Sequence, residues 1–385
     1  SRARPLERGV HRVTRLVTSH TIRWGSRDPE APLIVLFADS DLPGDAPGKE
    51  MATLARHLPD GACYASVRLP RAWPGDPAHT LAWFRAWLDK QRLAPVPVVL
   101  VGFGDGAAFA GGQLLADPAR FAAAALLYGT LPFDAGLPVT RGRLFGVPVF
   151  LAHGVHDMVI PVELQRRTWD YLVRESGSPL WAQREPGGHE LSAKTVSGLA
   201  GWIEARLGFL QRQGTPVGDT PAAQVYWPAL PDGRLPARHG EPPEVSVTTP
   251  QQQQSQNAPL ELQEALFSRI MQADGVLTAP SAVSVPGARA FVLRPGDAGG
   301  PREAFIVPEL GEFGHLHPEY DGSLHLVLPI TLARDVMAKG WGVTHPLAGL
   351  RLSPGMVMIF GPRDVAELAI VTAIVCASHA YASGR

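Results

Sequence analysis

A glycine-spaced turn in the N-terminal half is the feature of this sequence that most suggests chemistry. The segment VPVVLVGFGDGAAFAGG, residues 96–112, has the pattern of a buried strand, a tight turn and a helix of small residues. Such a turn presents a catalytic nucleophile when it reads G-x-S-x-G. Here Gly104 stands at the central position, so no side chain is available to attack a substrate. Asp105 could serve instead, but that frame puts Phe103 where the turn requires a small residue.

Two later segments contain residues suited to acid and base roles. Asp157 lies in HGVHDMVIP, at the end of a predicted strand, and His189 lies in the glycine-rich PGGHE before a predicted helix. Nucleophile, acid and histidine follow one another in this chain order in one large class of hydrolases. The acid holds the histidine in the tautomer that accepts and returns a proton. The alternatives are ordinary roles, a helix cap for Asp157 and a surface position for His189.

Together these motifs resemble the phospholipase/carboxylesterase branch of the α/β-hydrolase family, whose relatives include acyl-protein thioesterases. The resemblance covers about residues 30–208 and is carried by VGFGDG, HGVHDMVIP and PGGHE, with LLYGTLPFD similar to the same group. It implies that Asp157 is the triad acid and His189 the triad base.

The sequence departs from this family at three places on the reaction side. Gly104 replaces the nucleophile serine, and Phe37-Ala38 stands where the family usually has a His-Gly pair that helps to form the oxyanion hole. The segment RAWPGDPAHT is also shorter than the family's substrate loop. Three departures favour natural divergence over an isolated replacement of the serine. Phe37, Ala38 and Phe103 are therefore candidate substrate contacts.

A His–Asp pair without a nucleophile can still act as a general base. The resemblance includes relatives that use such a base for cyclisation, elimination or direct reaction of a substrate with dioxygen. We therefore expect cofactor-free, non-hydrolytic acid/base chemistry on a small specialised-metabolism substrate, with no metal. Two alternatives remain open: a carboxylesterase or thioesterase whose nucleophile has been replaced by glycine, and a catalytically silent binding protein.

A second candidate site is the histidine-rich segment EFGHLHPEYDGSLHLVLP, residues 312–329. His315 and His317 alternate, so they share one face of a strand, and Asp321-Gly322 predicts a hairpin turn that returns His325 toward them. A three-residue loop would place His317 opposite His325, whereas a two-residue loop would place them on opposite faces. Three histidines could bind a metal, but hydrogen bonds across a half-buried hairpin are the favoured interpretation.

This segment, together with KGWGVTHPLAG and GMVMIFGPRD, resembles the luciferase-like domain of fungal luciferase and of many bacterial proteins. The resemblance runs from about residue 260 to 381. It implies oxidation of a hydroxylated pyrone by dioxygen without metal or flavin. The candidate pocket residues are then His315, His317, His325 and His345.

The elements around these motifs predict the architecture. Strand-like and helix-like segments alternate up to about residue 210, which indicates a parallel sheet flanked by helices. We therefore expect an α/β-hydrolase fold over residues 1–210, a Pro/Gln-rich linker over 211–257, and a smaller α+β domain over 258–385. In the linker, Tyr226 and Trp227 could pack. The last domain should contain strands at AVSVPG, RAFVLRP, EAFIVP and GMVMIFG, helices at LELQEALFSRIMQ and TLARDVMAKG, and a terminal helix.

Composition narrows the function classes. The chain has 385 residues, a net charge of -1 and 45% hydrophobic residues, so no bulk charge favours nucleic acid or an acidic membrane. Cys63 and Cys376 are too few and too distant for a disulfide framework. No secretory signal is seen, and the apolar run LAIVTAIVCA is too short to span a bilayer. We therefore expect a cytoplasmic protein with a small-molecule substrate and no nucleic-acid or membrane partner. The sequence does not predict an oligomeric state.

Overall fold

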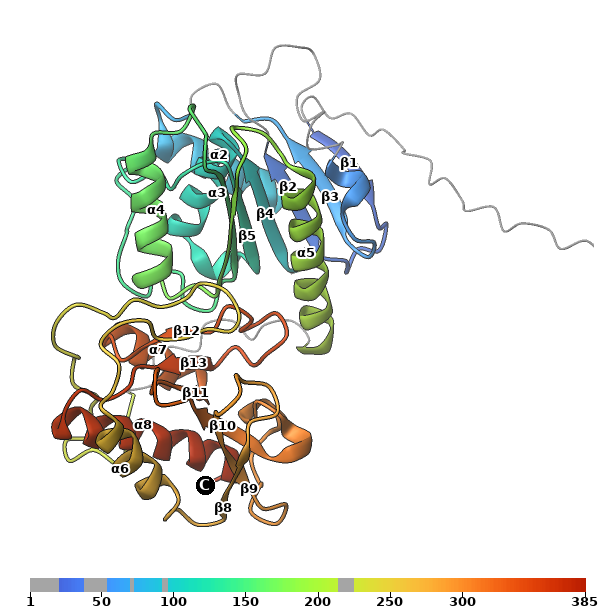
Figure 1. Ribbon diagram of the computed structural model, residues 1–385. Coiled ribbons are helices and arrows are strands. Elements are labelled where there is room, and N and C mark those ends of the chain that lie inside the picture. The colour runs from blue at the N-terminus through green and yellow to red at the C-terminus, as the bar shows by residue number, and fades with distance from the viewer. Residues whose placement is uncertain (1–20, 38–53, 70–72, 92–95, 214–224) are drawn as a thin grey trace, which may run out of the picture.

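The computed structural model describes residues 21–37, 54–69, 73–91, 96–213 and 225–385. Figure 1 shows two bodies, each built around its own sheet. The upper body contains strands β1 to β7, and we call it the N-terminal domain. The lower body contains β8 to β13, and we call it the C-terminal domain.

The N-terminal sheet has the strand order β1-β3-β2-β4-β5-β6-β7. The strands are β1 (Thr21–Gly25), β2 (Leu33–Phe37), β3 (Cys63–Val67), β4 (Val98–Phe103), β5 (Ala123–Leu127), β6 (Val149–Gly154) and β7 (Leu180–Glu185). Among the described strands, β1 pairs antiparallel with β3 and all other neighbours pair parallel. Every residue of β2, β4, β5 and β6 is buried, which explains their continuous apolar sequences.

Helices cover both faces of this sheet. The helices are α2 (Pro77–Gln91), α3 (Asp105–Ala116), α4 (Val162–Arg174) and α5 (Ala193–Gln213), with short 3-10 turns at Ala55–His57 and Pro118–Arg120. One core cluster joins α2, α3 and α4 to the sheet, and a second joins α5 to its other face. The fold is thus the predicted α/β-hydrolase architecture. Most of the helix expected at GKEMATLARHLP lies outside the described residues.

The C-terminal sheet is antiparallel throughout, in the order β12-β13-β11-β10-β9-β8. Its strands are β8 (Val276–Pro280), β9 (Arg289–Leu293), β10 (Glu312–Leu316), β11 (Leu324–Val327), β12 (Gly342–Thr344) and β13 (Met356–Ile359). The domain also contains the helices α6 (Leu260–Ile270), α7 (Ile330–Ala338) and α8 (Val365–Ser383). Two strand predictions were wrong. Residues 282–287 are irregular, because β8 rather than AVSVPG pairs with β9. Residues 303–308 contain parts of two 3-10 turns (Arg302–Ala304 and Pro308–Leu310) and a single bridge.

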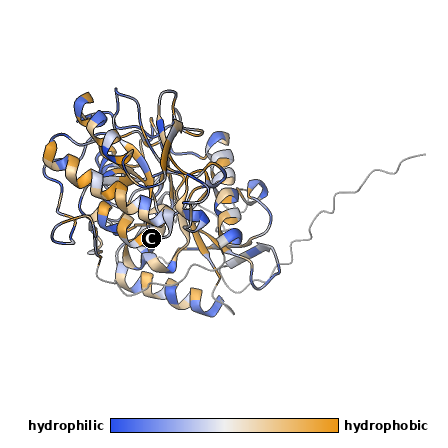
Figure 2. Ribbon diagram, turned by 90° about the horizontal axis from the view of Figure 1, so that it is seen from below, coloured by the Kyte–Doolittle hydropathy of each residue, from blue (hydrophilic) through white to orange (hydrophobic). Residues whose placement is uncertain are grey.

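The last helix, α8, forms part of the C-terminal core. It is capped by Asp364, whose side chain accepts a hydrogen bond from the backbone N–H of Glu367 at 2.8 Å. By length and composition alone, its 19 residues, with a mean hydropathy of 1.6, are enough to cross a membrane. The run LAIVTAIVCA, which is part of this helix, was judged too short to do so. Leu368, Val371 and Ile374 are buried in the C-terminal core cluster. Figure 2 shows that hydrophobic and hydrophilic stretches alternate along the helices.

The segment expected to be a linker is well packed where it is described. The side chain of Trp227 is 1% exposed, and its indole N–H donates to Asp335 of α7 at 2.8 Å. The two domains also make direct contact, because the hydroxyl of Thr344 donates to the carbonyl of Gly177 at 2.7 Å. The described part of this segment contacts both domains, since Val245 packs against the C-terminal core cluster and Val247 against the N-terminal one.

Candidate functional site

The turn between β4 and α3 has the geometry of a nucleophile elbow centred on Gly104. This residue has φ 55° and ψ −122°, a conformation that is strained for residues with a side chain. A Cβ atom added at Gly102 would lie 2.1 Å from the carbonyl oxygen of Gly106, and one added at Gly106 would lie 2.3 Å from that of Phe37. Both flanking glycines are therefore required by the close approach of strand and helix.

This frame excludes Asp105 from the apex of the turn. Asp105 is the first residue of α3, and the small residues needed on either side of the apex are centred on Gly104. The side chain of Phe37 is fully buried and packs edge-on against Phe109, with ring centroids 5.1 Å apart, and its contact with a substrate stays a prediction. Ala38 lies outside the described residues.

Asp157 and His189 lie within hydrogen-bond distance, as predicted. The Nδ1 atom of His189 is 2.9 Å from Oδ2 of Asp157, whose side chain is fully buried. The other oxygen, Oδ1, accepts the backbone N–H groups of Val159 and Ile160 at 2.9 and 3.1 Å. Asp157 therefore organises its own loop and orients the imidazole as well. An ionised carboxylate can only accept, so Nδ1 of His189 carries the proton and Nε2 is the basic atom.

Two aromatic rings flank this imidazole. The ring centroid of His189 is 4.9 Å from that of Phe103 and 6.2 Å from that of Tyr128. Tyr128 follows β5 with a positive φ of 49°, and its hydroxyl lies 3.1 Å from that of Thr195 on α5. The predicted role of Phe103 as part of the site is consistent with this contact. Tyr128 lies in LLYGTLPFD, one of the segments that resemble the family, but the sequence did not single it out as a site residue.

A second histidine lies buried in the strand that leads to this loop. His153, on β6, is 4% exposed, and neither ring nitrogen has a hydrogen-bond partner among the described residues. Burial and the nearby Arg184 lower the pKa of His153 to about 4, although Asp157 opposes the shift. The ring is therefore neutral at neutral pH.

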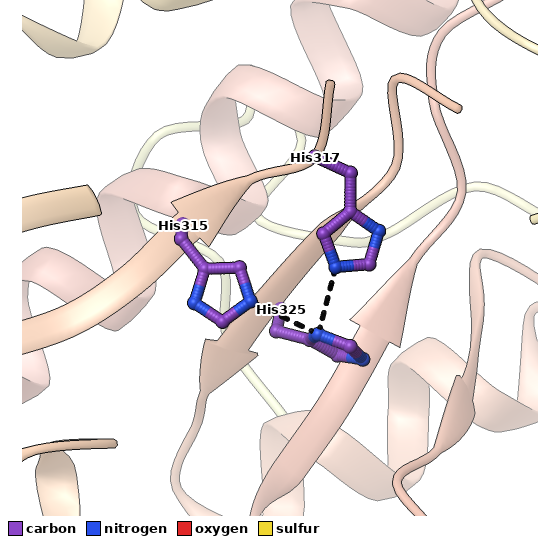
Figure 3. Close-up of side chains that lie close together, drawn as sticks. All are labelled: His315, His317 and His325. Carbon is purple, nitrogen blue, oxygen red and sulfur yellow. Dashed lines mark hydrogen bonds between the residues drawn. The ribbon is translucent and has the colours of Figure 1, made fainter. Parts of the chain in front are cut away.

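Three histidines of the C-terminal domain come together at one end of the β10–β11 pair. His315 of β10 is directly opposite His325 of β11. His317 follows β10, and its backbone N–H donates to the carbonyl of Ser323 at 2.9 Å. The connection between the strands, residues 317–323, is longer than either loop considered from sequence. His317 nevertheless points to the same side as the other two rings (Figure 3).

Carboxylates contact the Nδ1 atoms of two of these rings. Nδ1 of His315 lies 2.8 Å from Oε1 of Glu312, and Nδ1 of His317 lies 2.8 Å from Oδ2 of Asp321. The Nε2 atoms of both rings lie 3.1 Å from Nδ1 of His325. Figure 3 shows the three rings converging, with dashed lines marking these two contacts. The ligand atoms all lie within 4.8 Å of one another, close enough to bind one ion together.

His345 and Gln251 complete the group around His325. The ring centroid of His345 lies 4.9 Å from that of His325, and its Nδ1 accepts the backbone N–H of Leu347 at 3.1 Å. Oε1 of Gln251 lies 3.1 Å from Nε2 of His325. Burial lowers the pKa of His345 to about 3 and moves that of His325 well below its ordinary value. Sequence reasoning missed Gln251 because it lies in a glutamine run that was interpreted as linker.

The hydrogen bonds around Glu312 determine its ionisation. Burial alone would raise the pKa of Glu312, but hydrogen bonds with His315 and Ser281 bring it below the ordinary value. The pKa of His315 is lowered, mainly by burial, although Glu312 opposes that shift. The buried pair is therefore an ionised carboxylate beside a neutral imidazole.

Comparisons with known proteins match both halves of the chain. The family described as Phospholipase/Carboxylesterase matches residues 82–205, and the Luciferase domain family matches residues 310–378. The luciferase of Armillaria ostoyae is 42% identical over 77 residues, and that of Neonothopanus nambi is 38% identical over 77 residues. Each match covers 18% of this chain and 27% of the luciferase. The chain therefore matches about a quarter of the length of these luciferases.

Solved structures with a similar fold include a carboxylesterase and an acyl-protein thioesterase. The Bacillus cereus carboxylesterase is 18% identical, with a TM-score of 0.40, and the similarity covers 48% of this chain and 92% of that one. Acyl-protein thioesterase 2 of Zea mays is 19% identical, with a TM-score of 0.39, and the similarity covers 49% and 99% of the two chains. From its fold and its family matches, this chain joins an esterase-like α/β-hydrolase domain to a luciferase-like domain.

Proposed function

We propose that the N-terminal domain is a non-hydrolytic enzyme in which His189, oriented by Asp157, removes a proton from a small substrate. The observation that carries this proposal is the pairing of His189 with Asp157 at 2.9 Å beside an elbow whose apex is Gly104. The base and its orienting acid are retained, and the nucleophile position has no side chain.

The chemistry follows from what remains in the site. Proton abstraction requires a positioned neutral imidazole and asks nothing of residue 104 except space. Hydrolysis through an acyl-enzyme requires the nucleophile, and its loss typically reduces turnover about a million-fold. The rings of Phe103 and Tyr128 are buried and pack against His189, so they restrict the orientation of the imidazole. The proposed substrates are therefore small enols or phenols, and the proposed outcome is cofactor-free cyclisation, elimination or oxygenation.

Exchange of substrate protons with solvent tests the proposal without knowledge of the final product. The full chain is incubated in deuterated water with a panel of 1,3-dicarbonyl compounds and hydroxypyrones, and exchange at carbon is followed by NMR. We expect exchange that His189→Ala abolishes. The matched control is His79→Ala, since His79 is an exposed histidine on α2, outside the loops of Asp157 and His189. Exchange by the wild type that survives in His189→Ala would contradict the proposal.

A second candidate function belongs to the C-terminal domain. The Luciferase domain match at residues 310–378 contains all four histidines of the cluster, which favours oxidation of a hydroxylated pyrone by dioxygen. Oxygen uptake with such a pyrone distinguishes the two sites. If His325→Ala abolishes oxygen uptake and His189→Ala does not, the reaction belongs to the C-terminal domain. Absence of turnover and of proton exchange, with retained ligand binding, would favour the binding-protein alternative.

A further inference from the structure

We propose that His315, His317 and His325 form a three-histidine site for a divalent transition-metal ion. This proposal concerns the C-terminal domain and does not depend on the function proposed for His189. It departs from the expectation of a metal-free protein drawn from the sequence.

The tautomers of two rings follow from their partners. Glu312 and Asp321 are carboxylates that can only accept hydrogen bonds when ionised. They lie 2.8 Å from Nδ1 of His315 and Nδ1 of His317, so each Nδ1 carries the proton. The Nε2 atoms of these two neutral rings therefore present lone pairs.

The tautomer of His325 is fixed through Gln251. Nε2 of Gln251 donates to the carbonyl oxygen of Thr344 at 3.2 Å, which turns Oε1 of the same amide toward the imidazole. His325 must then donate from Nε2 to that oxygen at 3.1 Å. Nδ1 of His325 is left with a lone pair, on the side that faces His315 and His317.

Three lone pairs thus point toward one another in the protein interior. Nδ1 of His325 lies 3.1 Å from Nε2 of His315 and 3.1 Å from Nε2 of His317, yet none of these atoms has a proton to donate. A shared cation converts this repulsion into attraction. Imidazole nitrogens bind zinc at about 2.0–2.1 Å, which places two ligands of a tetrahedral site about 3.3 Å apart. The two distances to Nδ1 of His325 are close to that value, and all three ligand atoms lie within 4.8 Å of one another.

The negative charges of the two carboxylates that contact these rings would balance a divalent cation. Glu312 is 1% exposed and Asp321 is fully buried. Among the ion pairs of the described residues, these carboxylates contact histidines and no lysine or arginine. Two buried negative charges without a compensating cation are unfavourable. A divalent ion held by three neutral imidazoles balances them, in the carboxylate–histidine–metal arrangement known from zinc sites.

The ligand set indicates the class of ion. Imidazole ligands suit zinc, iron, copper and nickel better than calcium or magnesium. His345 is outside the set, because its Nδ1 accepts the N–H of Leu347 and its neutral ring is then protonated at Nε2. Three protein ligands leave at least one coordination position for water or a substrate, as in catalytic zinc sites.

Cobalt provides a spectroscopic test on the full chain. After treatment with a chelator and its removal, the protein is titrated with Co²⁺, and metal content is measured by mass spectrometry. We expect one equivalent per chain, with visible absorption that Zn²⁺ removes by competition. A folded protein, shown by circular dichroism, that takes up neither ion at micromolar concentration would overturn the proposal.

Variants assign the ion to these residues. His317→Ala and, separately, His325→Gln should abolish stoichiometric cobalt binding. Asp321→Asn, which leaves all three ligands in place, should weaken it by about 10–100-fold. The matched control is His379→Ala, since His379 is a histidine of the same domain that bonds the carbonyl of Asp274 and lies outside the cluster. Cobalt binding in folded His317→Ala or His325→Gln as tight as in the control would overturn the assignment.

Discussion

The rings of His189 and Phe103 pack together with their centroids 4.9 Å apart. Because Phe103 immediately precedes Gly104, this contact holds the base beside the apex of the elbow. The α/β-hydrolase domain therefore retains the relative placement of base and turn while lacking a nucleophile on that turn.

Restoring the serine alone is expected to give poor esterase activity. If the site has diverged, Gly104→Ser should hydrolyse nitrophenyl acetate far more slowly than a working esterase, because Phe37-Ala38 replaces the family's oxyanion pair. Burst kinetics and labelling by a fluorophosphonate measure the result. Rapid hydrolysis with a burst would instead identify the protein as a serine hydrolase lacking its nucleophile.

Adding a side chain at the apex is expected to cost stability. Gly104 has φ 55° and ψ −122°, so Gly104→Ala should lower the free energy of unfolding by about 1–3 kcal/mol. Proton exchange dependent on His189 should persist. Gly201→Ala is the control, since Gly201 lies in α5 with no atom within 4 Å of an added Cβ, and alanine there should be neutral or stabilising. Denaturant unfolding compares the two, and equal stability would contradict the strain argument.

The N-terminal fold and its His–Asp pair were predictable because their signals are local. Buried parallel strands give continuous apolar runs, and the elbow has a fixed glycine spacing. The edge strands β1 and β7 were missed. Their sequences, TIRWG and LWAQRE, mix polar and apolar residues because one side of an edge strand contacts solvent.

The histidine cluster depends on contacts that no local pattern encodes. Asp321 was interpreted as a turn residue, but its buried side chain accepts from His317 and from the hydroxyl of Ser323, which holds a longer connection in place. Gln251 reaches His325 across 74 positions of the sequence. The residues of the cluster could be named from sequence, whereas their convergence required the tertiary structure.

Arg206 is expected to couple the two domains. Its guanidinium donates to the carbonyl of Ala122 at 2.7 Å and also to the carbonyl of Gly349 in the C-terminal domain. Arg206→Met leaves these buried acceptors without their donor. We expect this to lower the free energy of unfolding by about 1–3 kcal/mol for each acceptor. We expect a lower melting temperature and separate calorimetric transitions for the two domains. Arg212→Met, an exposed position on α5, is the control and should change neither. A single unchanged transition in Arg206→Met would refute the coupling.

His153 is expected to make the N-terminal domain sensitive to acid. Its pKa is about 4 in the folded protein, mainly because of burial, against 6.5 for an ordinary histidine. Between these values the unfolded chain binds a proton that the folded chain does not, so stability is full above about pH 6.5 and falls as the pH drops toward 4. The loss approaches about 3 kcal/mol, since each pKa unit corresponds to about 1.4 kcal/mol. His153→Phe removes the titrating group, so its free energy of unfolding should decline less over the same range. Denaturant unfolding of both proteins at about pH 7 and about pH 4.5 measures the difference, and an identical acid loss in the two would show that His153 is not the responsible group.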